Sequence, residues 1–215
     1  MVYKYDTKKF PFQNLVKDVF QVEDLEKLHT HYNYPTGMCT MEDNSNSLYH
    51  QRFYDKLRTG WVEFIDVYEN FIKEVVTDTV EEDFIFQTTP TLRVHLVGNW
   101  ATPEFHCDSQ AGYNHPDGEI NFIIPLTECY DTNSLWLESK QGAGDYKPVA
   151  MENGDLFKFY GNTCRHGNKV NVTNKTRVTF DFRILPLSKY KPEEFSQSGT
   201  RNMKFEIGSY YKEIK

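Results

Sequence analysis

Two side chains that can bind a metal ion stand two positions apart in the segment Phe105-His-Cys-Asp. On an extended strand, residues i and i+2 project from the same face, so His106 and Asp108 would point together while Cys107 points away. A second histidine, His166, follows 58 residues after Asp108 (166 − 108). Two neutral imidazoles and one carboxylate on one face of an octahedral ion leave its other positions open, as in non-haem iron(II) sites. The spacing therefore predicts a His-Asp-His metal site.

A pair of residues suited to binding a carboxylate follows the distal histidine. Arg177 stands eleven residues after His166 (177 − 166), and Thr179 lies two positions further on, at the same-face position of a strand. A guanidinium fork and a hydroxyl together can hold a carboxylate by charge-assisted hydrogen bonds. A dicarboxylate that chelates a metal through its keto acid end would have its other end fixed there. Taken singly, a solvated strand arginine and a hydrogen-bonded loop histidine are the simpler interpretations, but the combination in this order favours the metal site.

The elements that would position these residues fall into two regions. In the first ninety residues, apolar side chains recur mainly at three- and four-residue intervals. This period predicts one or two short helices within 12–31, a turn at 34–37, and one long helix that is capped by Ser47 and reaches residue 76. The buried face of these helices would cover a sheet formed by the rest of the chain.

Beyond residue 84 the period of the apolar residues changes to two. This pattern predicts strands at 84–87, 91–97, 104–108, 120–126, 134–138, 156–160 and 177–185, with a last edge strand at 205–207. Seven or more short strands indicate a sandwich or barrel. In the last long strand, one face carries Val178, Phe180, Phe182 and Ile184, and the other carries Arg177, Thr179, Asp181 and Arg183. The polar face must meet water or line a wet cavity.

Composition and charge narrow the class of protein further. With 39% hydrophobic and 15% aromatic residues the chain folds, and its length fits a single domain. The net charge of −7 and the lack of a Lys/Arg cluster argue against nucleic acid and favour a small-molecule partner. The first residues carry no apolar leader, and no run of eighteen apolar residues occurs, so we expect a cytoplasmic protein without a membrane partner. The four cysteines are expected to be free thiols.

The motif formed by His106, Asp108, His166 and Arg177 resembles that of the Fe(II)/2-oxoglutarate dioxygenase superfamily. More narrowly, the chain is similar to a small group of oxygenase-like proteins that are named after a streptomycin-biosynthesis protein. The segments that carry this closer resemblance are 93–96, 105–109, 118–127, 133–139, 159–162 and 177–183. They cover about residues 90 to 186, and the helical N-terminal region carries little of the resemblance.

The resemblance implies a mainly β fold with α, a double-stranded β-helix (jelly-roll, cupin-like) with packed N-terminal helices. It implies Fe(II), 2-oxoglutarate as co-substrate and O2, with ascorbate as a candidate reductant. Arg177 and Thr179 would hold the distal carboxylate of 2-oxoglutarate, and Asn121 matches a further co-substrate contact of the family. Thr179 stands where the family commonly has Ser. Because related halogenases have a small residue in place of Asp108, hydroxylation or desaturation with release of succinate and CO2 is favoured over halogenation.

Arg93, His115 and Glu119 are the candidates for binding a polar small-molecule substrate. Exposed loop charges, or a buried ion pair for Arg93, are the competing interpretation of these residues. We expect one oxygenase domain over 1–215, with a helical region at 1–83, a jelly-roll core at 84–186 and a C-terminal extension at 187–215. Two other functions stay open, namely a cupin-like metal enzyme that does not use 2-oxoglutarate and a non-catalytic jelly-roll that binds a ligand. The sequence identifies neither the substrate nor the oligomeric state.

Overall fold

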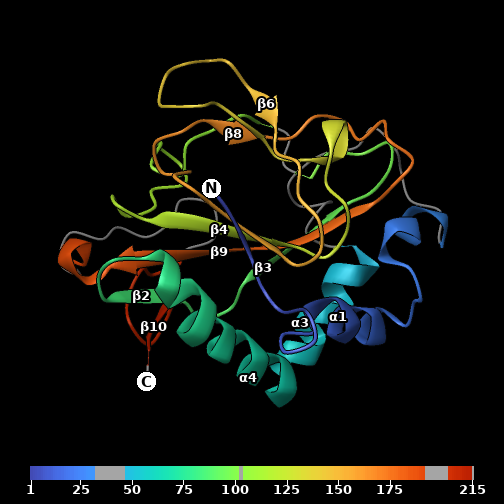
Figure 1. The fold of residues 1–215 in the computed structure, drawn as a ribbon, viewed down its shortest axis with the longest axis horizontal. Coiled ribbons are helices and arrows are strands. Elements are labelled where there is room, and N and C mark those ends of the chain that lie inside the picture. The colour runs from blue at the N-terminus through green and yellow to red at the C-terminus, as the bar shows by residue number, and fades with distance from the viewer. Residues whose placement is uncertain (32–46, 102–103, 192–202, 215) are drawn as a thin grey trace.

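A large antiparallel sheet forms the centre of the molecule. The computed structural model describes residues 1–31, 47–101, 104–191 and 203–214. Within them, strands follow the order β1-β7-β4-β9-β2-β10, and β3 also pairs with β9 (Figure 1). Their bounds are β1 Val2–Lys4, β2 Phe84–Gln87, β3 Thr91–His95, β4 Ile120–Pro125, β7 Asp155–Phe159, β9 Arg177–Pro186 and β10 Tyr211–Glu213. Strand β9 is the longest and contacts β2, β3 and β4, so it organises the sheet.

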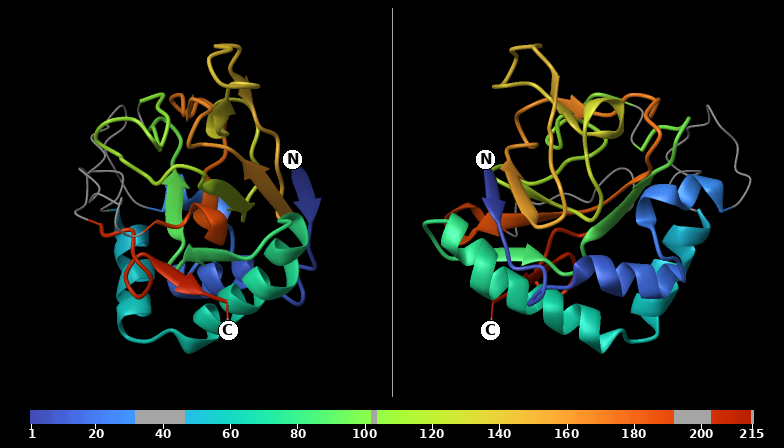
Figure 2. Two further views of the ribbon diagram at one scale, coloured as in Figure 1. Left: turned by 90° about the vertical axis from the view of Figure 1, so that its left-hand side faces the viewer. Right: turned by 45° about the vertical axis from the view of Figure 1, so that its right-hand side comes forward.

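A smaller sheet lies on the side of the large sheet opposite the helices. It consists of β5 Trp136–Leu137, β6 Lys147–Pro148 and β8 His166–Gly167, in the order β6-β5-β8. Figures 1 and 2 show the resulting layers, with the helices below the large sheet and the small sheet and its loops above it. The polar face of β9 therefore points toward the space between the two sheets. The mainly β prediction with N-terminal helices is confirmed, whereas closure into a double-stranded β-helix stays a prediction.

The N-terminal helices cover the apolar face of the large sheet. They are α1 Phe12–Phe20, α3 Leu48–Arg58 and α4 Val62–Phe71, with a 3-10 helix at Leu25–Thr30 and a π-helical turn at Ile72–Val76. Ser47 caps α3 as predicted, because its side chain accepts a hydrogen bond from the His50 N–H. The prediction of one long helix was wrong. Gly60 has a φ of +88°, a left-handed conformation that ends α3 and starts a new helix direction. The turn predicted at 34–37 lies outside the described residues.

Aromatic side chains form most of the core between the helices and the sheet. Phe180 and Phe182 of β9 are buried, and the ring of Phe180 lies 5.4 Å from that of Phe53 on α3 and 5.4 Å from that of Phe64 on α4. Burial of such rings is the main source of stability in a core of this kind. The predicted alternation along β9 is confirmed, since the intervening polar side chains lie on the cavity side of the sheet.

Several predicted strands differ from the observed ones. The segment 104–108 forms a single antiparallel bridge, His106 to His166, rather than a strand. The strands predicted at 134–138 and 91–97 are shorter, and the last edge strand is at Tyr211–Glu213 instead of 205–207. Cys107, Cys129 and Cys164 are free thiols as predicted, and Cys39 lies outside the described residues. In the described part of the chain, none of the helices has the length and apolar character needed to cross a membrane.

Candidate metal centre

The structure brings His106, Asp108 and His166 together between the two sheets. The backbones of the two histidines pair directly, with N–H to O distances of 3.0 Å from His106 to His166 and 2.9 Å in the reverse direction. This bridge joins the loop before β4 to β8 across 60 residues of sequence (166 − 106). The Nε2 atoms of both imidazoles lie 3.5 Å from Oδ1 of Asp108, and all three side chains are buried. The predicted His-Asp-His cluster is therefore present as a compact set of ligand atoms.

Hydrogen bonds to the main chain fix the orientation of both imidazoles. Nδ1 of His106 lies 2.9 Å from the Glu104 carbonyl oxygen, and Nδ1 of His166 lies 3.0 Å from that of Cys164. A carbonyl oxygen only accepts hydrogen bonds, so Nδ1 carries the proton in each ring. Burial also lowers the pKa of His166 below its ordinary value, which favours the neutral ring. The Nε2 lone pairs therefore face Asp108, as metal-binding histidines require.

Two side chains hold the other oxygen of Asp108. Nε of Arg183 and Nδ2 of Asn121 each donate to Oδ2 at 2.8 Å. Oδ1, by contrast, is buried without a hydrogen-bond partner among the described residues. Burial raises the pKa of the Asp108 carboxyl, but the Arg183 guanidinium outweighs burial and holds that pKa well below its ordinary value. Asp108 is thus an ionised carboxylate with one oxygen left for a further positive group.

A closed ring of hydrogen bonds fixes Asp108, Gly161 and Asn121 relative to one another. The Asp108 N–H donates to the Gly161 carbonyl oxygen (2.9 Å), the Gly161 N–H donates to Oδ1 of Asn121 (3.0 Å), and the Asn121 amide donates back to Asp108. A Cβ at position 161 would lie 2.9 Å from the Asn121 amide, so the ring needs glycine there. Within this ring Asn121 uses Oδ1 and one of its two amide N–H groups, and it also lines the cavity that contains Arg177, so its contact with a co-substrate stays a prediction.

These features fit a metal ion. The two bare Nε2 atoms and the unpartnered Oδ1 converge, their ligand atoms lie within 4.8 Å of one another, and the donor set of two imidazoles and one carboxylate suits a first-row divalent ion. An unpartnered buried carboxylate oxygen is unfavourable by itself, and a cation between the three ligands would satisfy it. The site is therefore a candidate metal centre.

A small inner cavity of about 50 Å³ lies next to this centre, and both predicted carboxylate-binding residues line it. Arg177 is only 4% exposed, and its Nε has no hydrogen-bond partner among the described residues. Burial lowers the pKa of Arg177 to about 10. Thr179 is also buried and lies on the same face of β9. A buried guanidinium that forms no ion pair within the described part of the chain is well suited to bind an anion.

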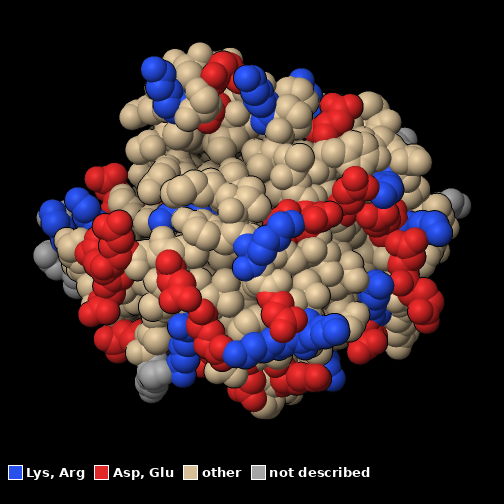
Figure 3. Space-filling model, in the orientation of Figure 1, with Lys and Arg blue, Asp and Glu red and all other residues tan. Residues whose placement is uncertain are grey.

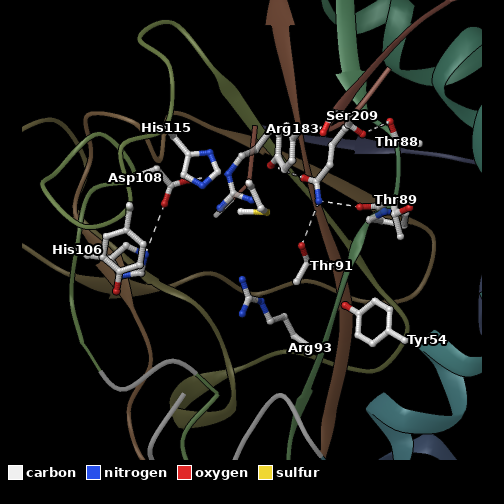
Figure 4. A pocket seen from close by; sticks show the side chains of 15 residues that line it. Tyr54, Thr88, Thr89, Thr91, Arg93, His106, Asp108, His115, Arg183 and Ser209 are labelled. Atoms are coloured by element: carbon white, nitrogen blue, oxygen red, sulfur yellow. Dashed lines mark hydrogen bonds and ion pairs between the residues drawn. The ribbon is translucent and has the colours of Figure 1, made fainter. Parts of the chain in front are cut away.

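A larger outer cavity of about 300 Å³ lies on the other side of the triad (Figure 4). His106, Asp108 and Arg183 reach it, and so do the predicted substrate residues Arg93 and His115. Glu119 does not line it, because its carboxylate is buried against His115 and Tyr211. Arg93 also forms the ion pair considered as the competing interpretation, with Nε 2.7 Å from Oδ1 of Asp181.

Sequence reasoning missed several residues of the site. Arg183 was given no role in the metal site; it lies 3.5 Å from Asp181, but its closer partner is Asp108. Its place on the polar face of β9 was the available signal. Tyr113 stacks on His106 with ring centroids 4.3 Å apart, and Tyr210 lines the outer cavity from the C-terminal segment. No spacing in the sequence pointed to either tyrosine, because loops far apart in the chain bring them to the site.

Charged side chains of both signs are mixed on the surface of the protein that Figure 3 shows. On the face shown in Figure 3, lysine and arginine side chains lie among acidic ones instead of forming one basic patch. This mixture accords with the net charge of −7.

Fold and side chains together define a mainly antiparallel β protein with a buried His-Asp-His candidate metal centre. The streptomycin biosynthesis protein StrG of Streptomyces griseus is 35% identical over 208 residues, which are 97% of this chain and 95% of that protein. The chain therefore belongs to the family of StrG, in agreement with the predicted oxygenase-like group. No family model matches the sequence.

Solved structures show the fold at lower sequence identity. CytC3, solved with Fe(II) and alpha-ketoglutarate, is 12% identical, with a TM-score of 0.53 over 100% of this chain and 90% of that chain. The non-heme monooxygenase ThoJ, solved as a nickel complex, is 13% identical, with a TM-score of 0.47 over 80% of this chain and 77% of that chain. The similarity to CytC3 supports a shared fold.

Proposed function

We propose that this protein is an Fe(II)- and 2-oxoglutarate-dependent dioxygenase that hydroxylates or desaturates a polar small molecule. The proposal rests above all on Oδ1 of Asp108, which has no hydrogen-bond partner among the described residues and faces two bare imidazole nitrogens. Beside it lies a cavity lined by Arg177, which forms no ion pair within the same residues. Membership in the StrG family supports it, because the name of that relative refers to the biosynthesis of a small molecule. The CytC3 structure, solved with Fe(II) and alpha-ketoglutarate, has the same fold.

Each group would have a defined place in this proposal. Nε2 of His106, Nε2 of His166 and Oδ1 of Asp108 would hold Fe(II), while Arg177 and Thr179 would hold the distal carboxylate of 2-oxoglutarate. When bound, iron, 2-oxoglutarate and O2 supply the oxidising chemistry, with succinate and CO2 as products. The chain orients the imidazoles through Nδ1 and keeps Asp108 ionised. Asp108 occupies a ligand position, which favours hydroxylation or desaturation over halogenation.

The buried Arg177 favours a 2-oxoglutarate-dependent enzyme over a cupin-like metal enzyme that does not use 2-oxoglutarate. Such an enzyme needs the three ligands but has no use for a buried guanidinium that forms no ion pair within the described residues. A non-catalytic ligand-binding jelly-roll needs neither feature. Burying a cation without a partner is unfavourable, so its presence favours an anionic ligand.

The test is formation of succinate from 2-oxoglutarate by protein loaded with Fe(II), in the presence of ascorbate and O2. We expect slow turnover without substrate that is lost in His106→Ala and in Arg177→Met. Arg58→Met, which removes an exposed arginine at the end of α3, serves as the matched control and should keep the wild-type rate. Circular dichroism checks that each variant folds. Metal binding without any 2-oxoglutarate binding would favour the cupin-like enzyme, and no metal binding at all would favour the ligand-binding module.

A further inference from the structure

His115 is held in one orientation beside the outer cavity. Its Nδ1 lies 2.8 Å from Oε2 of Glu119, and Oε1 of Glu119 accepts a hydrogen bond from the Tyr211 hydroxyl. A carboxylate only accepts hydrogen bonds, so the Nδ1 of His115 donates. The rings of Phe205 and Tyr210 lie 4.8 and 6.0 Å from the imidazole and restrict its rotation. The C-terminal segment thus fixes the ring of His115.

The opposite nitrogen of His115 is free for a ligand. Nε2 has no hydrogen-bond partner among the described residues, and His115 lines the outer cavity whereas Glu119 does not. In a neutral ring that donates through Nδ1, Nε2 is a hydrogen-bond acceptor. The cavity therefore offers an acceptor close to the metal centre, since a ring nitrogen of His115 lies within 4.8 Å of a carboxylate oxygen of Asp108.

Hydrogen-bond donors line the opposite wall of the outer cavity. Figure 4 shows the guanidinium of Arg93 pointing into the space between Asp108 and Thr91. Arg93 uses Nε and Nη2 on Asp181, at 2.7 and 3.4 Å, which leaves Nη1 without a partner among the described residues. Thr91 accepts a hydrogen bond from the Gln87 amide at 3.2 Å, and its own hydroxyl proton stays available. A ligand in this cavity must therefore both donate and accept hydrogen bonds.

The charges around the outer cavity argue against a charged ligand there. A cation would lie beside the guanidinium of Arg93, which points into the cavity. Both arginines that line the outer cavity are paired with carboxylates, Arg93 with Asp181 and Arg183 with Asp108. Arg177, which forms no ion pair in the described part of the chain, lines only the inner cavity. An anion in the outer cavity would meet no uncompensated cation there and would lie close to Asp108.

We infer that the outer cavity binds a small uncharged molecule carrying several hydroxyl groups, one of which donates a hydrogen bond to Nε2 of His115. Hydroxyl groups both donate and accept, so the same ligand satisfies His115, Arg93 and Thr91. The volume of about 300 Å³ lies at the lower end of the range of small-molecule sites, which fits a single small metabolite. As the substrate site of an oxygenase, this cavity rests on the proposed function, but ligand binding does not require turnover.

The inference is tested with three six-carbon probes that share one skeleton and differ in charge, namely sorbitol, gluconate and sorbitol 6-phosphate. Binding to the metal-loaded protein with 2-oxoglutarate under nitrogen is measured by calorimetry. We expect sorbitol to bind about tenfold more tightly than either anion, since only the anions would place an uncompensated charge in the cavity. If either anion binds as tightly as sorbitol, or if sorbitol does not bind at millimolar concentrations, the inference is wrong.

Variants of His115 test the contact itself. His115→Leu should weaken sorbitol binding about tenfold, because it removes one hydrogen bond from a buried site. His115→Gln keeps an acceptor on a side chain of similar reach and should stay within about threefold of the wild type. His31→Leu, at an exposed histidine, is the control, and thermal melting verifies folding of each variant. Unchanged sorbitol affinity in His115→Leu would overturn the contact.

Different results would overturn the proposed dioxygenase activity and the proposed ligand class. Sorbitol binding without succinate formation from 2-oxoglutarate would overturn the dioxygenase and keep the ligand site. Succinate formation in a protein that prefers the anionic probes would keep the dioxygenase and overturn the ligand class.

Discussion

Asn121 of β4 and Arg183 of β9 are direct neighbours across the sheet, and both side chains donate to Oδ2 of Asp108. Because cross-strand neighbours on one face lie side by side, the register of β4 on β9 places two donors at one carboxylate oxygen. The other oxygen is thereby turned toward the imidazoles. The pairing of β4 with β9, and not the conformation of the loop that carries Asp108, therefore determines the orientation of the carboxylate.

Replacing Arg183 by Met should weaken metal binding. The Asp108 carboxyl would lose the guanidinium that lowers its pKa, so a larger fraction would be protonated and its orientation would be freer. Loss of such an outer partner typically lowers metal affinity about 10- to 100-fold. Calorimetric titration with Co(II) measures the change, and Arg58→Met is the control. An affinity equal to the wild type in a folded Arg183→Met protein would show that Arg183 does not position the ligand.

Gly161→Ala should lower both stability and metal affinity. The added Cβ would lie 2.9 Å from the Asn121 amide and would displace it from Asp108. Overpacking of this kind typically destabilises a protein by about 1–3 kcal/mol. In the double variant with Asn121→Ala, the three atoms that the Cβ would meet are absent, so the additional effect of Gly161→Ala should largely disappear. Urea unfolding of the four proteins of this cycle gives the coupling, and additive effects would contradict the predicted contact.

Arg177→Met should stabilise the ligand-free protein while abolishing binding of 2-oxoglutarate. The guanidinium is buried without an ion pair among the described residues, and burial lowers its pKa to about 10. Met keeps much of the volume and removes the buried charge, for an expected gain of about 1–3 kcal/mol in the free energy of unfolding. Chemical unfolding without ligand measures stability, and calorimetry with 2-oxoglutarate measures binding. A loss of stability would indicate a structural role for Arg177.

His95 should make the protein sensitive to acid. Its ring is buried near the Arg177 guanidinium, and both features lower its pKa to about 3, although the carbonyl oxygens of Asn133 and Asn99, at 3.2 and 2.7 Å from its two nitrogens, oppose this shift. Between pH 6.5 and about 3 the unfolded chain binds a proton that the folded protein does not, so stability falls as the pH decreases through this window. His95 alone should account for about 2 kcal/mol between pH 6.5 and 5.

Urea unfolding of the wild type and His95→Gln at both pH values measures this effect. Gln lacks the titrating group, so its free energy of unfolding should fall less with decreasing pH, even if its stability at pH 6.5 is lower. Because His166 also has a lowered pKa, both proteins should keep some acid sensitivity. Equal pH dependence in the two proteins would exclude His95 as its source.

Local sequence patterns correctly predicted the features that are set by residues within a single strand or helix. The alternation along β9 predicted its buried and polar faces, and the period of the N-terminal region predicted the helices and the Ser47 cap. The same patterns could not show the break at Gly60, because the apolar stripe of α3 and α4 continues across it. The expected strand at 104–108 was wrong for a related reason, since this segment pairs only at His106.

The sequence by itself predicted the candidate metal ligands His106, Asp108 and His166, and Arg177 beside them, from residue type and spacing alone. Only the tertiary structure decided how these residues are held. The bonds from Arg183 and Asn121 to Asp108, and from Tyr211 through Glu119 to His115, join segments separated by 13 to 92 residues. Such contacts depend on strand register and on the packing of distant loops, which no local period encodes.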